Sequence, residues 1–90
     1  MAELIKTNGD VIEITPKNGK AFTLKEAQKY VGGYVELVGL KHHEMLICNE
    51  EAICYGLPYN PIATSLLADS YGDGCQALYG DIIHCKSNEF

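Results

Sequence analysis

The stretch from Gly56 to Thr64 constrains the fold of this chain more than any other. Within it, Asn60 followed by Pro61 is typical of a helix start, because asparagine caps the first turn and proline suits the first helical position. Pro58 and Pro61 also restrict the backbone on both sides of Tyr59 and Asn60. We therefore expect a helix to begin at Pro61, with Tyr59 and Asn60 presented rigidly in front of it.

The rest of the chain alternates short apolar segments with turn residues. Asn8-Gly9 predicts a hairpin turn of type I′, because both central positions of that turn need positive φ. The nearly continuous apolar run at 45–48 is typical of a strand in the middle of a sheet. The expected strands cover residues 4–6, 11–15, 34–38, 45–48, 52–55 and 82–85, and residues 76–79 are a weaker candidate.

Two short helices are expected. Thr23 and Glu26 form a capping-box pattern at the start of a helix over 24–31, which Gly32-Gly33 ends. The second helix covers about 61–68, and a loop follows at 69–74. The residues expected to face the sheet are Leu24, Ala27 and Val31 in the first helix and Ile62, Ala63 and Leu66 in the second.

The predicted order is ββαβββαβ or close to it. Because short turns join neighbouring strands, we expect an α+β fold, with a mainly antiparallel sheet of five to six strands and two short helices on one face. Residues 1–85 form the expected single domain, and 86–90 a polar tail that frays. A chain of 90 residues buries only about 60–65% of its unfolded surface. Its core is marginal, and homodimerisation would stabilise it.

The amino-acid composition limits the classes of function that are expected for this chain. The net charge is −5, with seven lysines and no arginine, which disfavours direct binding to nucleic acid. No apolar run approaches the ~18 residues of a membrane span, and the first residues lack a secretory signal, so we expect a cytoplasmic protein. We interpret its four cysteines as reduced core residues, and a disulfide framework is the less favoured alternative.

The candidate ligand-binding residues begin with Tyr59, Asn60 and Thr64. Asn60 either only caps the helix or also reads a base or ribose edge. Tyr59 either stacks on a base or packs over the sheet, with neither favoured. Thr64 lies one turn after Asn60 and can share its face, although a structural threonine is the simpler interpretation.

Three further candidates are Asn49, Glu50 and Lys20. Asn49 and Glu50 could bind a ribose or a metal ion, although a solvated turn is the simpler interpretation. Lys20 lies in a polar turn and could supply an ammonium group. Without arginine, phosphate recognition would depend on Lys17, Lys20 or Lys25.

No catalytic group, metal site or cofactor is expected. His84 and Cys85 are neighbours in a predicted strand, so they point to opposite faces and cannot easily form a dyad. His42-His43 has no second ligand pair at zinc spacing. No glycine-rich phosphate loop occurs.

The chain resembles a small family of unknown function, number 3846, which is spread through phages, plasmids and their bacterial hosts. The resemblance covers almost the whole chain and implies an accessory protein of a mobile element, but it carries no catalytic residues. The stretches that carry it are 5–11, 22–36, 48–51, 57–64 and 79–83.

Two hypotheses follow by analogy with small phage proteins that counteract host defence. The first is a non-enzymatic protein that sequesters a nucleotide-derived small molecule in the host cytosol, near Tyr59, Asn60 and Thr64 or between two subunits. The alternative is an acidic inhibitor of a host defence or regulatory protein, which could mimic nucleic acid. An acidic surface would favour the second hypothesis, and a concave site at Tyr59 and Asn60 the first.

Overall fold

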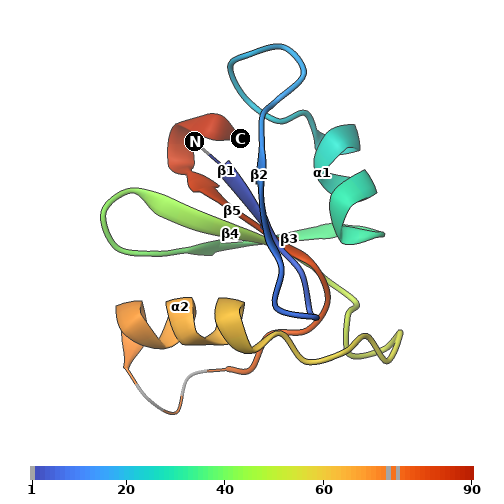
Figure 1. Ribbon diagram of the computed structural model, residues 1–90, viewed down its shortest axis with the longest axis vertical. Helices are drawn as coiled ribbons and strands as arrows, with labels where there is room; N and C mark the ends of the chain where they lie inside the picture. The colour runs from blue at the N-terminus through green and yellow to red at the C-terminus, as the bar shows by residue number, and fades with distance from the viewer. Residues whose placement is uncertain (1, 73, 75) are drawn as a thin grey trace.

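The computed structural model describes residues 2–72, 74 and 76–90, which form an α+β fold. Five antiparallel strands make one twisted sheet in the order β2-β1-β5-β4-β3 (Figure 1). The predicted class and antiparallel pairing are confirmed. The strands are β1 (Ala2–Ile5), β2 (Val11–Ile14), β3 (Val35–Gly39), β4 (Glu44–Asn49) and β5 (Ile82–Lys86), and the helices are α1 (Leu24–Val31), α2 (Pro61–Tyr71) and the short 3-10 helix η1 (Ser87–Glu89).

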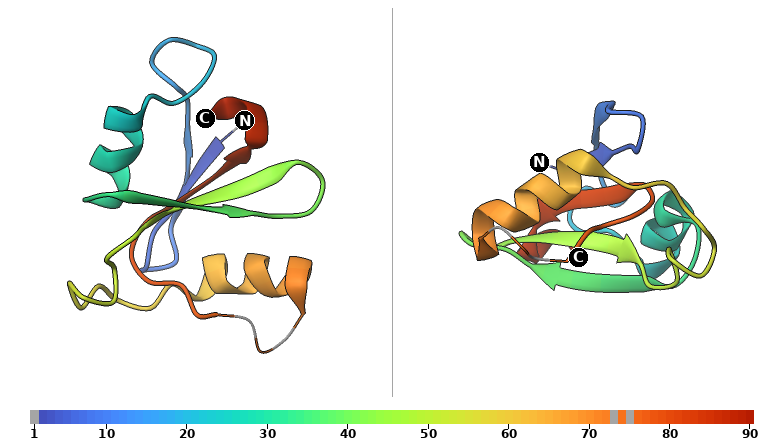
Figure 2. Two further views of the ribbon diagram at one scale, coloured as in Figure 1. Left: turned by 180° about the vertical axis from the view of Figure 1, so that it is seen from behind. Right: turned by 90° about the horizontal axis from the view of Figure 1, so that it is seen from below.

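The two helices cover opposite faces of the sheet, so the prediction of both on one face was wrong (Figures 1 and 2). Alternate residues of β4 show this: Met45 and Ile47 pack on the α1 side, whereas Leu46 and Cys48 pack on the α2 side. A strand that is covered on both faces is apolar at successive positions. The run at 45–48 has that pattern.

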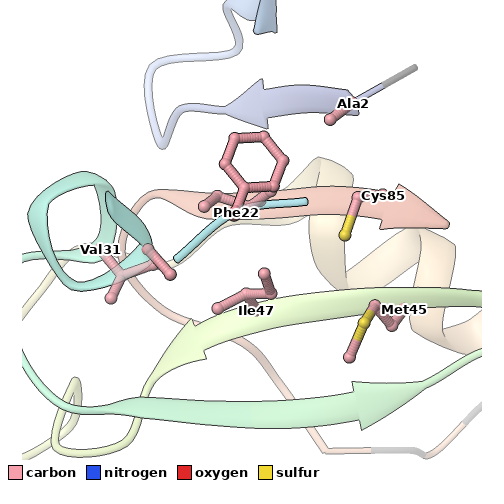
Figure 3. Packing of buried hydrophobic residues seen from close by; sticks show 8 residues of the cluster. Ala2, Phe22, Val31, Met45, Ile47 and Cys85 are labelled. Carbon is pink, nitrogen blue, oxygen red and sulfur yellow. The ribbon is translucent and has the colours of Figure 1, made fainter. Parts of the chain in front are cut away.

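Each side of the sheet has its own core. In Figure 3, the Phe22 ring lies in the α1-side core near Val31 and Ile47. Leu24 is exposed instead of packing with the α1-side core, and Leu67 is buried on the α2 side. The α1-side core consists of Ala2, Phe22, Ala27, Val31, Met45, Ile47, Ile83 and Cys85. The α2-side core consists of Ile5, Leu46, Cys48, Ala63, Leu67, Leu78 and Ile82.

The β1–β2 hairpin forms, but its turn is not of type I′. Within this turn, only Gly9 has positive φ. Gly9 N–H donates to Lys6 O, and Lys6 N–H donates to Asp10 O. This is the three-residue turn with a glycine bulge. Positive φ at two successive central positions occurs instead in the β3–β4 turn, at His42 (62°) and His43 (59°).

Residues 52–55 do not form the expected strand. They belong to a turn in which Tyr55 N–H donates to Glu51 O and Gly56 N–H donates to Ile53 O. A strand returning from β4 would need a free edge of β4, but β3 and β5 occupy both edges. The candidate strand at 76–79 is reduced to one bridge, between Tyr59 and Tyr79.

The segments after α2 and β5 also differ from expectation. α2 continues to Tyr71, so the helix includes the first part of the loop expected at 69–74, and Asp73 lies outside the described residues. The C-terminal residues include η1 and contact the rest of the fold. Phe22 N–H donates to Glu89 O at 2.6 Å, and Phe90 packs against the α1-side core. Among the described residues, no helix has the length and apolarity to cross a membrane.

Candidate functional site

Asn60 caps α2, as predicted, and its side chain is completely buried. Its Oδ1 accepts a hydrogen bond from Ala63 N at 3.1 Å. Its Nδ2 donates to Ile5 O at 3.0 Å and to Gly80 O at 2.9 Å. Both amide donors are used, so Asn60 joins α2 to β1 and to the chain before β5 and leaves no donor for a ligand.

Thr64 is also engaged inside the fold. Its Oγ1 donates to Asn60 O at 2.8 Å and accepts from Leu78 N at 2.9 Å. Tyr59 is half-exposed and packs edge-to-face on Tyr79, with ring centroids 5.9 Å apart. Of the three residues expected around the α2 start, only Tyr59 therefore offers a free surface.

The structure does not bring Asn49, Glu50 and Lys20 into one site with Tyr59. Asn49 is buried, and it donates from Nδ2 to Val31 O at 3.1 Å while its Oδ1 accepts from Glu51 N at 2.8 Å. It therefore fixes the end of β4 to the end of α1. Glu50 and Lys20 are exposed.

A hollow of about 630 Å³ lies beside α1, and it contains none of these six residues. Its volume is in the range of small-molecule sites, about 300–1,000 Å³. A second hollow of about 290 Å³ shares Lys17, Glu26 and Lys29 with it and extends to Tyr30. We call the larger one the lysine hollow, and it is lined by Lys17, Asn18, Thr23, Lys25, Glu26, Gln28 and Lys29.

Glu26 connects the two segments that line the lysine hollow. Its Oε1 accepts from Thr23 N at 3.2 Å, which completes the predicted capping box, and its Oε2 accepts from Lys17 N at 3.0 Å. The carboxylate therefore holds the loop before α1 against the first turn of the helix. Since it lies in the first turn of α1, the carboxylate also interacts favourably with the positive end of the helix dipole.

The lysine hollow is a positive region on an acidic protein. Residues 17–29 contain four of the seven lysines and only one of the twelve acidic residues. Lys17 and Lys25, which the sequence suggested for phosphate recognition, both line it, whereas Lys29 and Gln28 were missed. The signal for Lys29 was its spacing of four from Lys25 on a predicted helix.

The α2 side of the sheet carries a different charged cluster. The ring of His84 lies between two carboxylates, with Nδ1 3.3 Å from Glu3 Oε1 and Nε2 2.7 Å from Glu44 Oε1. Lys86 Nζ lies 3.2 Å from Glu44 Oε2. Hydrogen bonds from His84 and Lys86 hold the pKa of Glu44 below its usual value of 4.5.

Cys48 and Cys85 are free thiols in the core, as predicted, whereas Cys54 is exposed and Cys75 lies outside the described residues. Cys85 faces the α1-side core, away from His84, so the prediction that these neighbours point apart is confirmed. Burial raises the pKa of Cys85 to about 11 and that of Cys48 to about 12. Both thiols are protonated at neutral pH and are poor nucleophiles. In the described residues, no three His, Cys, Asp or Glu side chains are arranged to bind a metal ion.

Comparison with known proteins gives one result. No curated protein matches the chain, and no solved structure does. The sequence model of one family, described as "Domain of unknown function (DUF3846)", matches residues 4–90. This protein, with its two-sided antiparallel sheet and its lysine hollow beside α1, therefore belongs to the DUF3846 family.

Proposed function

We propose that this protein is a non-enzymatic binding protein that holds a nucleotide-type anion in the lysine hollow. The observation that carries the proposal is the gathering of Lys17, Lys25 and Lys29 around one hollow of ligand size, on a chain whose net charge is −5. An acidic protein repels anions in general, so a local positive site is the place where binding of an anion is most favourable.

In this proposal the lysines attract the phosphate of the ligand, and neighbouring groups contact the rest of the ligand. Each ammonium group is a point charge that can approach a phosphate, although it lacks the two-pronged geometry of arginine. The apolar stems of the lysines cover the walls of the hollow. Tyr30 packs edge-to-face on Phe22 and also lines the adjoining smaller hollow. The part of its ring that faces this hollow can contact a base, and stacking of a base on an aromatic ring is worth about 1–3 kcal/mol in single-strand complexes.

The biological setting is part of the same proposal. The protein acts as an accessory protein of a phage or plasmid, in the cytosol of the host. It lowers the free concentration of a nucleotide-derived defence signal by binding it, and no bond is made or broken. Sequestration of this kind requires only affinity and abundance, and a preformed hollow beside a capped helix suits that task.

A ligand panel tests the proposal. The full chain is titrated calorimetrically with linear and cyclic mono-, di- and oligonucleotides, and bound ligand is recovered after denaturation and identified by mass. We expect at least one ligand to bind and to be released unchanged. Release of an altered molecule would show an enzyme instead, and no binding across the panel would refute the ligand class.

Matched variants locate the site. Lys25→Gln with Lys29→Gln should weaken binding roughly tenfold or more, because each charge-assisted hydrogen bond contributes about 1.5–3 kcal/mol. Lys6→Gln with Lys41→Gln removes the same charge at positions that do not line the hollow and should have a small, salt-dependent effect. Equal losses in the two double variants would mean that net charge, rather than the hollow, governs binding.

A second candidate function is supported by the distribution of acidic side chains on the sheet. The four glutamates of the strands, Glu3, Glu13, Glu36 and Glu44, all lie on the α2 side of the sheet, as their alternation with core residues and their pairing register require. This asymmetry favours the inhibitor hypothesis, in which a negative surface meets a basic host protein. Glu13→Gln with Glu36→Gln should then reduce inhibition while leaving ligand binding unchanged.

A further inference from the structure

β3 is an edge of the sheet, and within the described residues no strand pairs with its outer side (Figure 2). Edge strands are usually protected from pairing with another chain by charged side chains, especially lysine, by proline or by a bulge. β3 has no lysine, proline or bulge, and its single charged residue is Glu36, because its sequence is VELVG and its register with β4 is continuous. The other edge, β2, is shorter and is closely followed by Pro16.

The hydrogen bonds to β4 decide which groups of β3 are left unpaired. Glu50 N–H donates to Tyr34 O, and Leu40 N–H donates to Glu44 O, each at 2.8 Å. These pairs flank the β3–β4 ladder in the same register. Because bonded and non-bonded pairs alternate along an antiparallel ladder, the even-numbered residues of β3 exchange hydrogen bonds with β4.

The odd-numbered residues Val35, Leu37 and Gly39 therefore direct their N–H and C=O groups away from the sheet. Tyr71 Oη donates to Gly39 O at 2.5 Å, which leaves that oxygen its second lone pair. The outward groups of these three residues repeat at the spacing that an incoming antiparallel strand requires.

The side chains along this edge suit a second copy of β3. Leu37 is 49% exposed and Tyr34 is 65% exposed, although both are large and apolar. An antiparallel pair with its two-fold axis at Leu37 places Leu37 opposite Leu37 and Tyr34 opposite Leu40. Glu36 then lies opposite Val38, so no like charges face each other across the new ladder.

We propose that two copies of this chain associate through their β3 strands, antiparallel and centred on Leu37, into one continuous sheet. The pairing satisfies the outward backbone groups of Val35, Leu37 and Gly39. It also buries the exposed Leu37 side chains against each other. The interface is independent of the lysine hollow, so this proposal can fail without affecting the proposed function.

Sedimentation equilibrium of the full chain, from micromolar to millimolar concentration, tests the pairing. We expect a reversible dimer whose dissociation constant rises roughly tenfold or more in Leu37→Lys, because two like charges then face each other at the axis. Ile12→Lys is the matched control, since Ile12 is 45% exposed on the opposite edge strand. A monomer at all concentrations, or a dimer that only Ile12→Lys weakens, would overturn the proposal.

A second measurement decides the matter if Leu37→Lys does not fold, as judged by circular dichroism. In a background that combines Cys54→Ser with Cys75→Ser, Leu37→Cys should form a covalent dimer on mild oxidation. Directly opposed residues in a bonded pair lie about 5.5 Å apart between Cα atoms, which is within the range for disulfides. Ile12→Cys in the same background should stay monomeric, and equal cross-linking of the two variants would contradict the register.

Discussion

Asn60 Nδ2 donates a hydrogen bond to the carbonyl oxygen of Ile5, which lies 55 residues earlier in the chain. The same nitrogen donates to Gly80 O, and Oδ1 accepts from Ala63 N. One buried amide thus connects the start of α2, the end of β1 and the chain entering β5. The same residue is the N-cap of α2 that the sequence predicted.

Replacing Asn60 separates its cap role from its bridging role. Asn60→Ala should cost about 2–4 kcal/mol, since a lost cap costs about 1 kcal/mol and unpaired buried carbonyls add about 1–3 kcal/mol. Asn60→Asp keeps the acceptor that caps α2 but removes both donors and places a carboxylate beside two carbonyl oxygens. Urea unfolding of both variants measures the effects. If Asn60→Asp were as stable as the wild type, the bridge to Ile5 and Gly80 would contribute nothing.

Local patterns in the sequence predicted the helix starts well. The Thr23–Glu26 capping box and the Asn60–Pro61 cap depend on residues three or four apart, and such short-range signals are visible in one sequence. The turn type of the β1–β2 hairpin is a local prediction that was wrong, and the other wrong predictions involve long-range pairing. The strand expected at 52–55 had suitable residues but no free sheet edge, and the side of the sheet that each helix covers depends on how the strands are ordered.

The candidate site was predicted only in part for the same reason. Asn60 and Asn49 have the chemistry of ligand-binding residues, but tertiary contacts bury them and use their amides. Burial of a polar residue is decided by elements far away in sequence, so one sequence cannot distinguish a structural amide from an exposed one. The lysine hollow was closer to prediction, because two of the lysines that the sequence suggests for phosphate recognition, Lys17 and Lys25, line it.

Substitutions in the β3–β4 turn should stabilise the folded protein. His42 and His43 both have positive φ, which costs about 1–2 kcal/mol for a residue that has a Cβ atom. His42→Asn with His43→Gly supplies residues suited to this turn and should raise the free energy of unfolding by about 1 kcal/mol. The gain is measured by urea unfolding against His42→Ala with His43→Ala, which keeps the strain. Equal stabilities would show that the turn is unstrained.

The thiols should differ sharply in reactivity. Cys54 is exposed, whereas Cys48 and Cys85 are buried, and burial raises their pKa values to about 12 and about 11. In a Cys75→Ser background, we expect one thiol to react with a maleimide in the native protein and three after denaturation. Mass spectrometry after digestion identifies the modified residue. Rapid native labelling of Cys48 or Cys85 would mean that its side of the core opens readily.

Acid should weaken the link between β4 and β5. Hydrogen bonds from His84 and Lys86 lower the pKa of Glu44 in the folded state, so its carboxylate stabilises the fold above the unfolded pKa, near 4.5. That contribution is lost as the pH falls through the lower, folded pKa. The difference in unfolding free energy between the wild type and Glu44→Gln should therefore be largest near neutral pH and should shrink below about pH 4.5. Urea unfolding from pH 7 to pH 3 measures it, and Glu50→Gln controls for the loss of one negative charge at an exposed position. A difference that stayed constant over this range would show that the Glu44 contacts do not depend on its ionisation.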